Sequence, residues 1–352
     1  MSMNNRSDKE HRYTSTGMKF WTFPEKLDAY RLRNGRSVIS THISPEGACN
    51  LKCPYCSVTH RKVWNRIDLE VIKDYVDRLQ SRGLLAVILT GGGEPTTYPK
   101  FNDLLEWLLE DRGLKVALIS NGTRWKNADT SLMRKLQWLR ISVNIFDGWE
   151  EEITCPPLTD TVTFGMSYVF TNDHEGAGGQ SENTLRQVVD HAHRLGAEYL
   201  RVLPDCQLVE TDLCEKHKEL DAAIMRLGDP IVFRQDKHHR PPKASVCHQS
   251  YFRPYLSEEV HPVTGTPGSV FPCDSVVLND RKYRFAEEYA LCPPEKILEY
   301  LDGKIAPRFD PRKACKGCVF ADTVDMLDEY VQHGTDRFDD VDLSVVTHRE
   351  FV

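Results

Sequence analysis

The chain has 352 residues, of which 40% are hydrophobic and 28% are charged, and its 45 basic and 52 acidic side chains give a formal net charge of −7. This composition excludes a disordered polypeptide and a membrane-spanning one, and the length allows about two domains at ~100–200 residues each. The acidic balance argues against general nucleic-acid binding, which uses a basic surface to contact phosphates. The 11 cysteines are an odd number, so they cannot all be paired in disulfides.

The N-terminal residues are polar and lack the apolar segment of a secretory signal, and the longest apolar runs are only strand-sized. We therefore expect a cytoplasmic protein. In that compartment, clustered cysteines more often bind metal or do chemistry than form disulfides. Residues 1–35 are expected to form an N-terminal arm.

Residues 36–205 alternate between short apolar strands and amphipathic helices about six times. The spacing predicts strands over 38–43, 86–90, 115–120, 139–146, 161–170 and 199–203, and helices over 68–79, 101–109, 131–137 and 182–195. Such alternation is typical of an α/β fold with a parallel sheet. A closed eightfold barrel usually needs about 250 residues. These ~170 residues therefore predict an open, partial (β/α)6 TIM-like barrel, with ligands bound at the carboxyl ends of its strands.

The pattern changes after residue 205. We expect a helical connector over 206–243, a small cysteine-rich domain over 244–320 and an acidic C-terminal tail over 321–352. Residues 321–342 hold eight acidic residues and one arginine, which is typical of a solvated face. The connector ends in basic residues that form either a solvated linker or a contact for an anionic substrate: Arg234, Lys237, His238, His239, Arg240 and Lys243.

Three cysteines, Cys49, Cys53 and Cys56, follow the first predicted strand with the spacing C-x3-C-x2-C. A tetrahedral zinc site would need a fourth protein ligand, and the nearest candidate, His60, is poorly spaced. A [4Fe–4S] cluster held by three cysteines instead leaves one iron open for a small chelating ligand. A zinc knuckle is the alternative.

This loop resembles the signature of the radical S-adenosylmethionine (SAM) superfamily, C-x3-C-x-aromatic-C, with Tyr55 as the aromatic residue. The resemblance implies a [4Fe–4S] cluster whose open iron chelates SAM. It also implies one-electron cleavage of SAM to methionine and a 5′-deoxyadenosyl radical, which removes a hydrogen atom from the substrate. A one-electron donor such as flavodoxin or ferredoxin is implied as a partner.

A glycine-rich turn follows the second predicted strand and is similar to the GGEP motif of the family, at Gly92, Gly93 and Glu94. The resemblance implies that this turn holds the amino group of SAM. The family also uses polar residues at two later strand ends for the carboxylate and ribose of SAM. The candidates for these contacts are Ser120, Asn121, Ser142 and Asn144. The alternative is that their side chains form hydrogen bonds with backbone groups of the turns.

A second group of four cysteines lies in the C-terminal region: Cys247, Cys273, Cys315 and Cys318. Four thiolates can close an iron–sulfur cluster that serves electron transfer or structure, and a zinc ribbon is the alternative. This region resembles the SPASM extension of radical SAM enzymes or its shorter twitch form. No cysteine follows Cys318, which points to one auxiliary [4Fe–4S] cluster. Cys292 is a competing ligand. The remaining cysteines are expected to be small buried side chains: Cys155, Cys206 and Cys214.

The sequence identifies neither a catalytic acid or base nor a substrate. Three classes of function stay open. The first is a radical SAM enzyme that acts on a peptide or small molecule. The second is a radical SAM enzyme that acts on a nucleobase or nucleotide, such as a modified base in DNA. The third is a non-catalytic zinc or iron–sulfur protein.

Overall fold

The computed structural model describes residues 7–33, 35–53, 55–143, 153–170, 182–278, 285–334 and 342–352. Its backbone contacts divide the chain into two compact units. Unit 1 comprises Met1–Gly47, His60–Gly93 and His239–Val352, and unit 2 comprises Ala48–Thr59 and Glu94–His238. None of the helices in the described ranges combines the length and the apolarity needed to cross a membrane.

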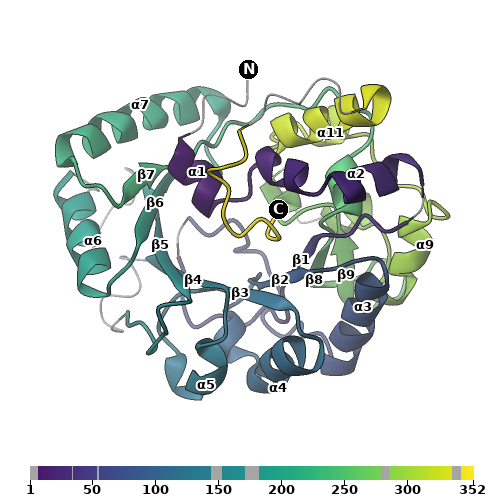
Figure 1. Cartoon of the computed structure of the whole chain (residues 1–352), viewed down its shortest axis with the longest axis horizontal. Coiled ribbons are helices and arrows are strands. Elements are labelled where there is room, and N and C mark those ends of the chain that lie inside the picture. Colours follow the sequence, from purple (N-terminus) through teal and green to yellow (C-terminus); the bar gives the residue numbers. More distant parts are fainter. Residues whose placement is uncertain are drawn as a thin grey trace. The chain divides into compact units, whose positions relative to one another are not determined.

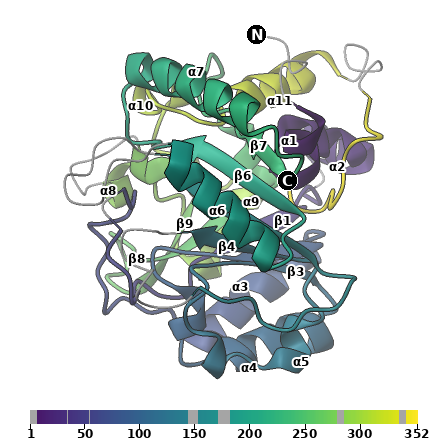
Figure 2. The same cartoon turned by 90° about the vertical axis from the view of Figure 1, so that its left-hand side faces the viewer.

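Unit 2 is built on five parallel strands in the order β7-β6-β5-β4-β3. Its strands are β3 (Lys115–Ser120), β4 (Trp138–Val143), β5 (Thr163–Phe170), β6 (Tyr199–Pro204) and β7 (Val232–Arg234). Its helices are α4 (Phe101–Glu106), α5 (Thr130–Met133), α6 (Glu182–Arg194) and α7 (Glu210–Leu227). The strands are mostly buried because helices cover them. Figure 1 shows α6 and α7 beside the strands that they contact, β5 to β7, and Figure 2 shows α6 lying along β6.

This arrangement matches the predicted α/β fold, with small differences in the bounds of the elements. The helix predicted over 101–109 is α for its first part and continues as a π-helical turn, Trp107–Asp111. The helix predicted over 131–137 is a single turn that Asp129 caps by accepting a hydrogen bond from the Ser131 backbone nitrogen. The strand β7 was not predicted, because three residues are too few to show an alternating pattern.

Unit 1 contains a four-stranded sheet in the order β2-β1-β8-β9. The strands are β1 (Ser40–Ile43), β2 (Ala86–Leu89), β8 (Tyr255–Val260) and β9 (Pro267–Phe271). Strand β1 is parallel to both β2 and β8, while β8 and β9 are antiparallel. Strand β8 belongs to the predicted cysteine-rich domain, so that domain continues the sheet that β1 begins. The division of the chain into functional domains stays a prediction.

The helices of unit 1 come from both ends of the chain. They are α1 (Asp8–Tyr13), α2 (Pro24–Arg31), α3 (Leu69–Ser81), α8 (Phe285–Tyr289), α9 (Ile297–Leu301), α10 (Pro311–Ala314) and α11 (Ala321–His333). The amphipathic pattern that predicts a helix over 68–79 corresponds to α3, which buries Ile72, Val76 and Leu79.

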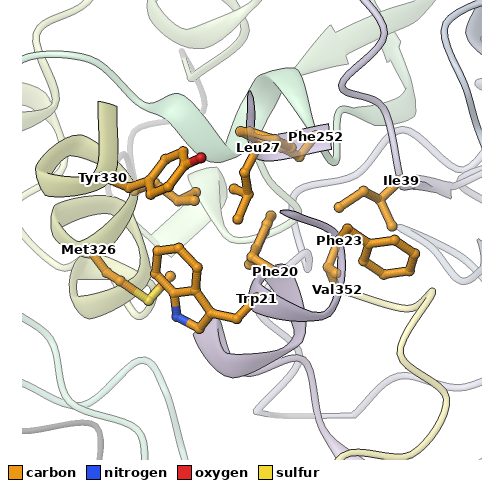
Figure 3. Close-up of a cluster of buried hydrophobic side chains, with 10 residues drawn as sticks. Phe20, Trp21, Phe23, Leu27, Ile39, Phe252, Met326, Tyr330 and Val352 are labelled. Atoms are coloured by element: carbon orange, nitrogen blue, oxygen red, sulfur yellow. The ribbon is translucent and has the colours of Figure 1, made fainter. Parts of the chain in front are cut away.

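Segments from both ends of the chain pack into a hydrophobic cluster of unit 1 (Figure 3). The expected N-terminal arm contributes Phe20, Trp21 and Leu27 to this cluster. The expectation of a solvated acidic tail is wrong for α11, because Leu327 and Tyr330 lie in the same cluster. The many acidic residues of this segment made its amphipathic pattern hard to see in the sequence. In α11 the acidic residues lie on the face opposite the buried apolar side chains.

We predict that Leu327→Ala lowers the free energy of unfolding by about 2–5 kcal/mol, because it leaves a cavity in the hydrophobic cluster. The measurement is urea unfolding followed by circular dichroism. Gln332→Ala on the exposed side of α11 is the matched control and should change stability by less than about 0.5 kcal/mol. Equal effects of the two substitutions would contradict the packing of α11.

Candidate functional site

The three cysteines of the C-x3-C-x2-C motif lie in one loop of unit 2, Ala48–Thr59. All three are half-buried. The Cys53 carbonyl accepts a hydrogen bond from the Cys56 backbone nitrogen at 3.1 Å, so the C-x2-C part forms a tight turn. Tyr55 lies within this turn and is 8% exposed. Half-buried thiols on one turn suit a metal centre that a second ligand must still reach.

A ring of side-chain hydrogen bonds ties this loop to the end of β3. Asn121 donates from Nδ2 to Asn50 Oδ1 at 3.0 Å, and Asn50 donates from Nδ2 to Thr123 Oγ1 at 2.8 Å. Thr123 closes the ring by donating from Oγ1 to Asn121 Oδ1 at 2.7 Å. The Asn121 Nδ2 also lies 3.9 Å from Cys49 Sγ. Asn121 was a predicted site residue, whereas Asn50 and Thr123 were not. Asn50 directly follows Cys49, and Thr123 lies two residues after Asn121.

Glu94 is buried in unit 2, and its carboxylate accepts hydrogen bonds only from this chain's own donors. Oε1 accepts from the Thr96 backbone nitrogen at 3.1 Å, from Thr96 Oγ1 at 2.8 Å and from Ser120 Oγ at 2.8 Å. Oε2 accepts from the Asn121 backbone nitrogen at 2.8 Å. Burial raises the pKa of Glu94, and these hydrogen bonds oppose the rise. Each carboxylate oxygen has about two lone-pair positions, and Oε2 accepts from one donor, so it has room for one more.

The backbone of Glu94 reaches the cysteine loop as well, since its nitrogen donates to the Ala48 carbonyl at 2.7 Å. Glu94 thus joins the start of the cysteine loop to the end of β3. The Ser120 hydroxyl is committed to Glu94 and also accepts from the Gly122 nitrogen at 3.1 Å. A contact of Glu94 or Ser120 with SAM stays a prediction.

In unit 1, the glycines of the GGGEP motif leave space for a buried carboxyl group on β8. A Cβ at Gly92 would lie 1.9 Å from Glu258 Oε1, and one at Gly91 would lie 2.7 Å from Ser44 Oγ. The Ser44 hydroxyl accepts a hydrogen bond from the Gly92 nitrogen at 2.7 Å. Glu258 is 1% exposed, and burial raises its pKa. Gly91, which precedes the part of the motif that is similar to the family, therefore also lies in close packing. The sequence alone did not reveal this contact.

The polar residues predicted at the end of β4 are only partly described. Ser142 is half-buried, and its Oγ lies 3.4 Å from Ser167 Oγ on β5. Asn144 lies outside the described residues. Ser142, Ser167 and Arg201 are register partners on β4, β5 and β6, so their side chains share one face of the sheet. Arg140 lies on that face two residues before Ser142.

The four cysteines of the second group line one cavity in unit 1, so the structure brings together the set that the sequence predicts: Cys247, Cys273, Cys315 and Cys318. Burial raises the pKa of Cys247 to about 12 and that of Cys318 to about 11. Such thiols stay protonated at neutral pH unless a metal stabilises the thiolates. Four thiols that line one cavity are a donor set of the kind that holds a closed [4Fe–4S] cluster or a zinc ion.

The other four cysteines belong to neither predicted ligand set. Cys292 is buried, and its carbonyl accepts a hydrogen bond from the Val270 nitrogen at 3.0 Å, but it is not among the residues that line the cysteine cavity. Cys155, Cys206 and Cys214 are half-buried, so the expectation that they are small buried side chains is wrong. Cys214 Sγ lies 3.7 Å from Glu210 Oε1.

The basic connector is largely neutralised within each unit. In unit 2, Arg234 contacts Asp221 and Asp236 at 2.6 Å each. In unit 1, Arg240 contacts Asp322 at 2.6 Å and Asp325 at 2.8 Å. These ion pairs favour a structural role for the two arginines over contact with an anionic substrate.

Residues 43–202 match the family model described as the radical SAM superfamily. One curated relative is an S-adenosylmethionine-dependent nucleotide dehydratase of Selenomonas ruminantium, 31% identical over 109 residues, which are 30% of this chain and 38% of the relative. Another is a 7-carboxy-7-deazaguanine synthase of Haemophilus influenzae, 27% identical over 122 residues, which are 34% of this chain and 51% of the relative. The chain thus spans about half the length of these relatives or less.

The fold resembles the crystal structure of Streptococcus suis SuiB bound to the precursor peptide SuiA, with a TM-score of 0.50 and 15% identity over 74% of this chain and 65% of that one. Residues 43–202 therefore form a radical SAM domain, as the cysteine motif predicts. Its parallel α/β architecture is consistent with the partial barrel of that superfamily. The family binds a [4Fe–4S] cluster and SAM, and these are the cofactors of this domain.

We predict that Glu94→Gln lowers the free energy of unfolding by about 1–3 kcal/mol, because an amide nitrogen would face a hydrogen-bond donor inside the protein. Hydrogen exchange should become faster at residues 96 and 120–123, where the side-chain hydrogen bonds of Glu94 end. The control is Glu110→Gln, because Glu110 is a half-exposed residue that pairs with Lys135. Unchanged exchange at residues 120–123 would contradict the anchoring role of the Glu94 carboxylate.

Proposed function

We propose that this chain is a radical SAM enzyme in which Cys49, Cys53 and Cys56 hold a [4Fe–4S] cluster with one iron left open for SAM. The observation that carries this proposal is the anchoring of one half-buried three-cysteine loop by Glu94 and Asn121. When bound, the cluster and SAM supply one-electron cleavage to methionine and a 5′-deoxyadenosyl radical, which takes a hydrogen atom from the substrate.

The residues of the chain position this chemistry. Asn121 and Asn50 fix the backbone that carries Cys49, and Glu94 fixes the start of the same loop. Oε2 of Glu94 can accept one further donor such as the ammonium group of SAM, with the hydroxyl of Ser142 and the side chain of Asn144 as further contacts. A one-electron donor such as flavodoxin or ferredoxin supplies the electron.

The second cysteine group supports an auxiliary [4Fe–4S] cluster of the twitch type. Its four cysteines line one cavity, and three of them are buried. A closed cluster has no open iron, so its role is electron transfer or structure. Cys292 is not required as a ligand in this arrangement.

We predict that Cys53→Ala abolishes formation of 5′-deoxyadenosine from SAM under dithionite. The two cysteines that remain, Cys49 and Cys56, cannot hold the cluster in place. Iron should fall from about eight per chain towards about four. Cys315→Ala should keep some SAM cleavage but lose the substrate-derived product. Cys214→Ala is the matched control, since Cys214 belongs to neither group, and it should retain both activities. About two zinc ions per chain and no 5′-deoxyadenosine would show a non-catalytic zinc protein instead.

For the substrate, we propose a nucleotide-like molecule in preference to a peptide. By their names, one curated relative dehydrates nucleotides and the other makes a deazaguanine, whereas the likeness to the peptide-bound enzyme extends only to the fold. The sheet face that carries Ser142 also carries Arg140 and Arg201. Arg140 is 7% exposed, and its Nε has no hydrogen-bond partner among the described residues. A buried guanidinium of this kind favours an anionic ligand.

We predict that a phosphorylated nucleotide stimulates 5′-deoxyadenosine formation more than the matching nucleoside or an unrelated peptide does. Arg201→Gln should raise the KM for that nucleotide about tenfold or more, because it removes a charge-assisted hydrogen bond. Arg226→Gln on the exposed side of α7 is the control and should leave the KM unchanged. Stimulation by a peptide alone would favour the peptide-modifying alternative.

A further inference from the structure

The wall of the cysteine cavity offers few hydrogen-bond donors. Three of its residues are prolines, which have no backbone N–H: Pro242, Pro272 and Pro311. Most of the others are apolar. Apart from the cysteines, the polar side chains in this wall belong to Gln249 and Ser275. The Ser275 hydroxyl already lies 3.4 Å from Asp274 Oδ1.

Gln249 is held in this wall by its backbone and not by its amide. It belongs to the short 3-10 helix His248–Tyr251, which directly follows Cys247. Its carbonyl accepts hydrogen bonds from the Phe252 nitrogen at 3.0 Å and from the Arg253 nitrogen at 2.8 Å. The side chain is 1% exposed, and neither the acceptor Oε1 nor the donor Nε2 of its amide forms a hydrogen bond within the described part of the chain. The buried Nε2 needs an acceptor, and a cluster sulfur held in the cavity would be one.

We propose that the side-chain amide of Gln249 donates an N–H hydrogen bond to a sulfur of the auxiliary cluster and raises its reduction potential. This inference rests on the proposed second cluster. Reduction adds negative charge to a cluster that the apolar wall shields from water, and an N–H donor stabilises the more negative state. Gln249 is a positioning and tuning residue, and it is not a ligand, because the four cysteines supply the ligand set.

The test is a redox titration followed by electron paramagnetic resonance on the full-length chain carrying Cys53→Ala, so that the auxiliary cluster supplies the signal. Gln249→Met keeps the length of the side chain and removes both N–H donors. The midpoint potential should shift to a more negative value. The matched control is Gln235→Met, because Gln235 is also buried with an unpartnered Oε1 but does not line the cavity. The control should leave the midpoint unchanged.

A second measurement keeps the proposal testable if Gln249→Met loses its cluster. In the chain with Gln249 intact and its glutamine side-chain amides labelled with ¹⁵N, the reduced cluster should show coupling to a labelled nitrogen. Absence of that coupling, or an unchanged midpoint in Gln249→Met, would overturn the role of Gln249. An iron content that does not fall in Cys315→Ala would instead overturn the second cluster itself, so the two failures are distinguishable.

Discussion

A carboxylate that is removed from water needs hydrogen-bond donors, and Glu94 finds all of its observed ones in the segments that build the first cysteine site. The carboxylate accepts from Ser120 and Asn121 at the end of β3 and from Thr96 after the glycine-rich turn. The Glu94 backbone nitrogen donates to the Ala48 carbonyl at the start of the cysteine loop, so this one residue connects the three segments. The ring of Asn50, Asn121 and Thr123 then fixes the loop beside Cys49. The acidic residue of the glycine-rich motif therefore organises the site as well as being a candidate ligand contact.

Side chains from other segments lie so close to Gly91 and Gly92 that only glycine fits at these positions of the glycine-rich motif. At Gly92 the buried carboxyl group of Glu258 lies where a Cβ would stand, and at Gly91 the hydroxyl of Ser44 does. Any larger residue at Gly92 would require the Glu258 side chain to move. The motif thus serves packing within its unit in addition to any contact with SAM. A sequence motif shared with a family does not separate these two roles, because both require the absence of a side chain.

The sequence predicts the alternation of strands and helices well, because each strand is a short apolar run bounded by glycine or asparagine. The spacing of Cys49, Cys53 and Cys56 is local and visible in the sequence, whereas the second set spreads from Cys247 to Cys318 and lines one cavity only in the folded chain. The ligand roles of both sets stay predictions. Prediction from the sequence fails where the determining interaction joins distant residues. The acids of α11 hide its buried face, and two of them, Asp322 and Asp325, bind Arg240. The place of Asn50 in the hydrogen-bond ring and that of Gln249 in the wall of the cysteine cavity are likewise invisible in the sequence. Neither residue type nor spacing shows which distant groups a side chain meets.

The two cysteine groups differ in exposure in a way that suits different chemistry. Cys49, Cys53 and Cys56 are half-buried, so a ligand and an electron can reach a cluster held there. Cys247, Cys315 and Cys318 are buried beside prolines and apolar side chains. In such an environment solvent contributes little to the stability of the reduced state, so the few hydrogen bonds from the wall matter more to the reduction potential. A cluster in the second site would therefore be tuned by protein groups, whereas one in the first site would be tuned by the ligand that binds to it.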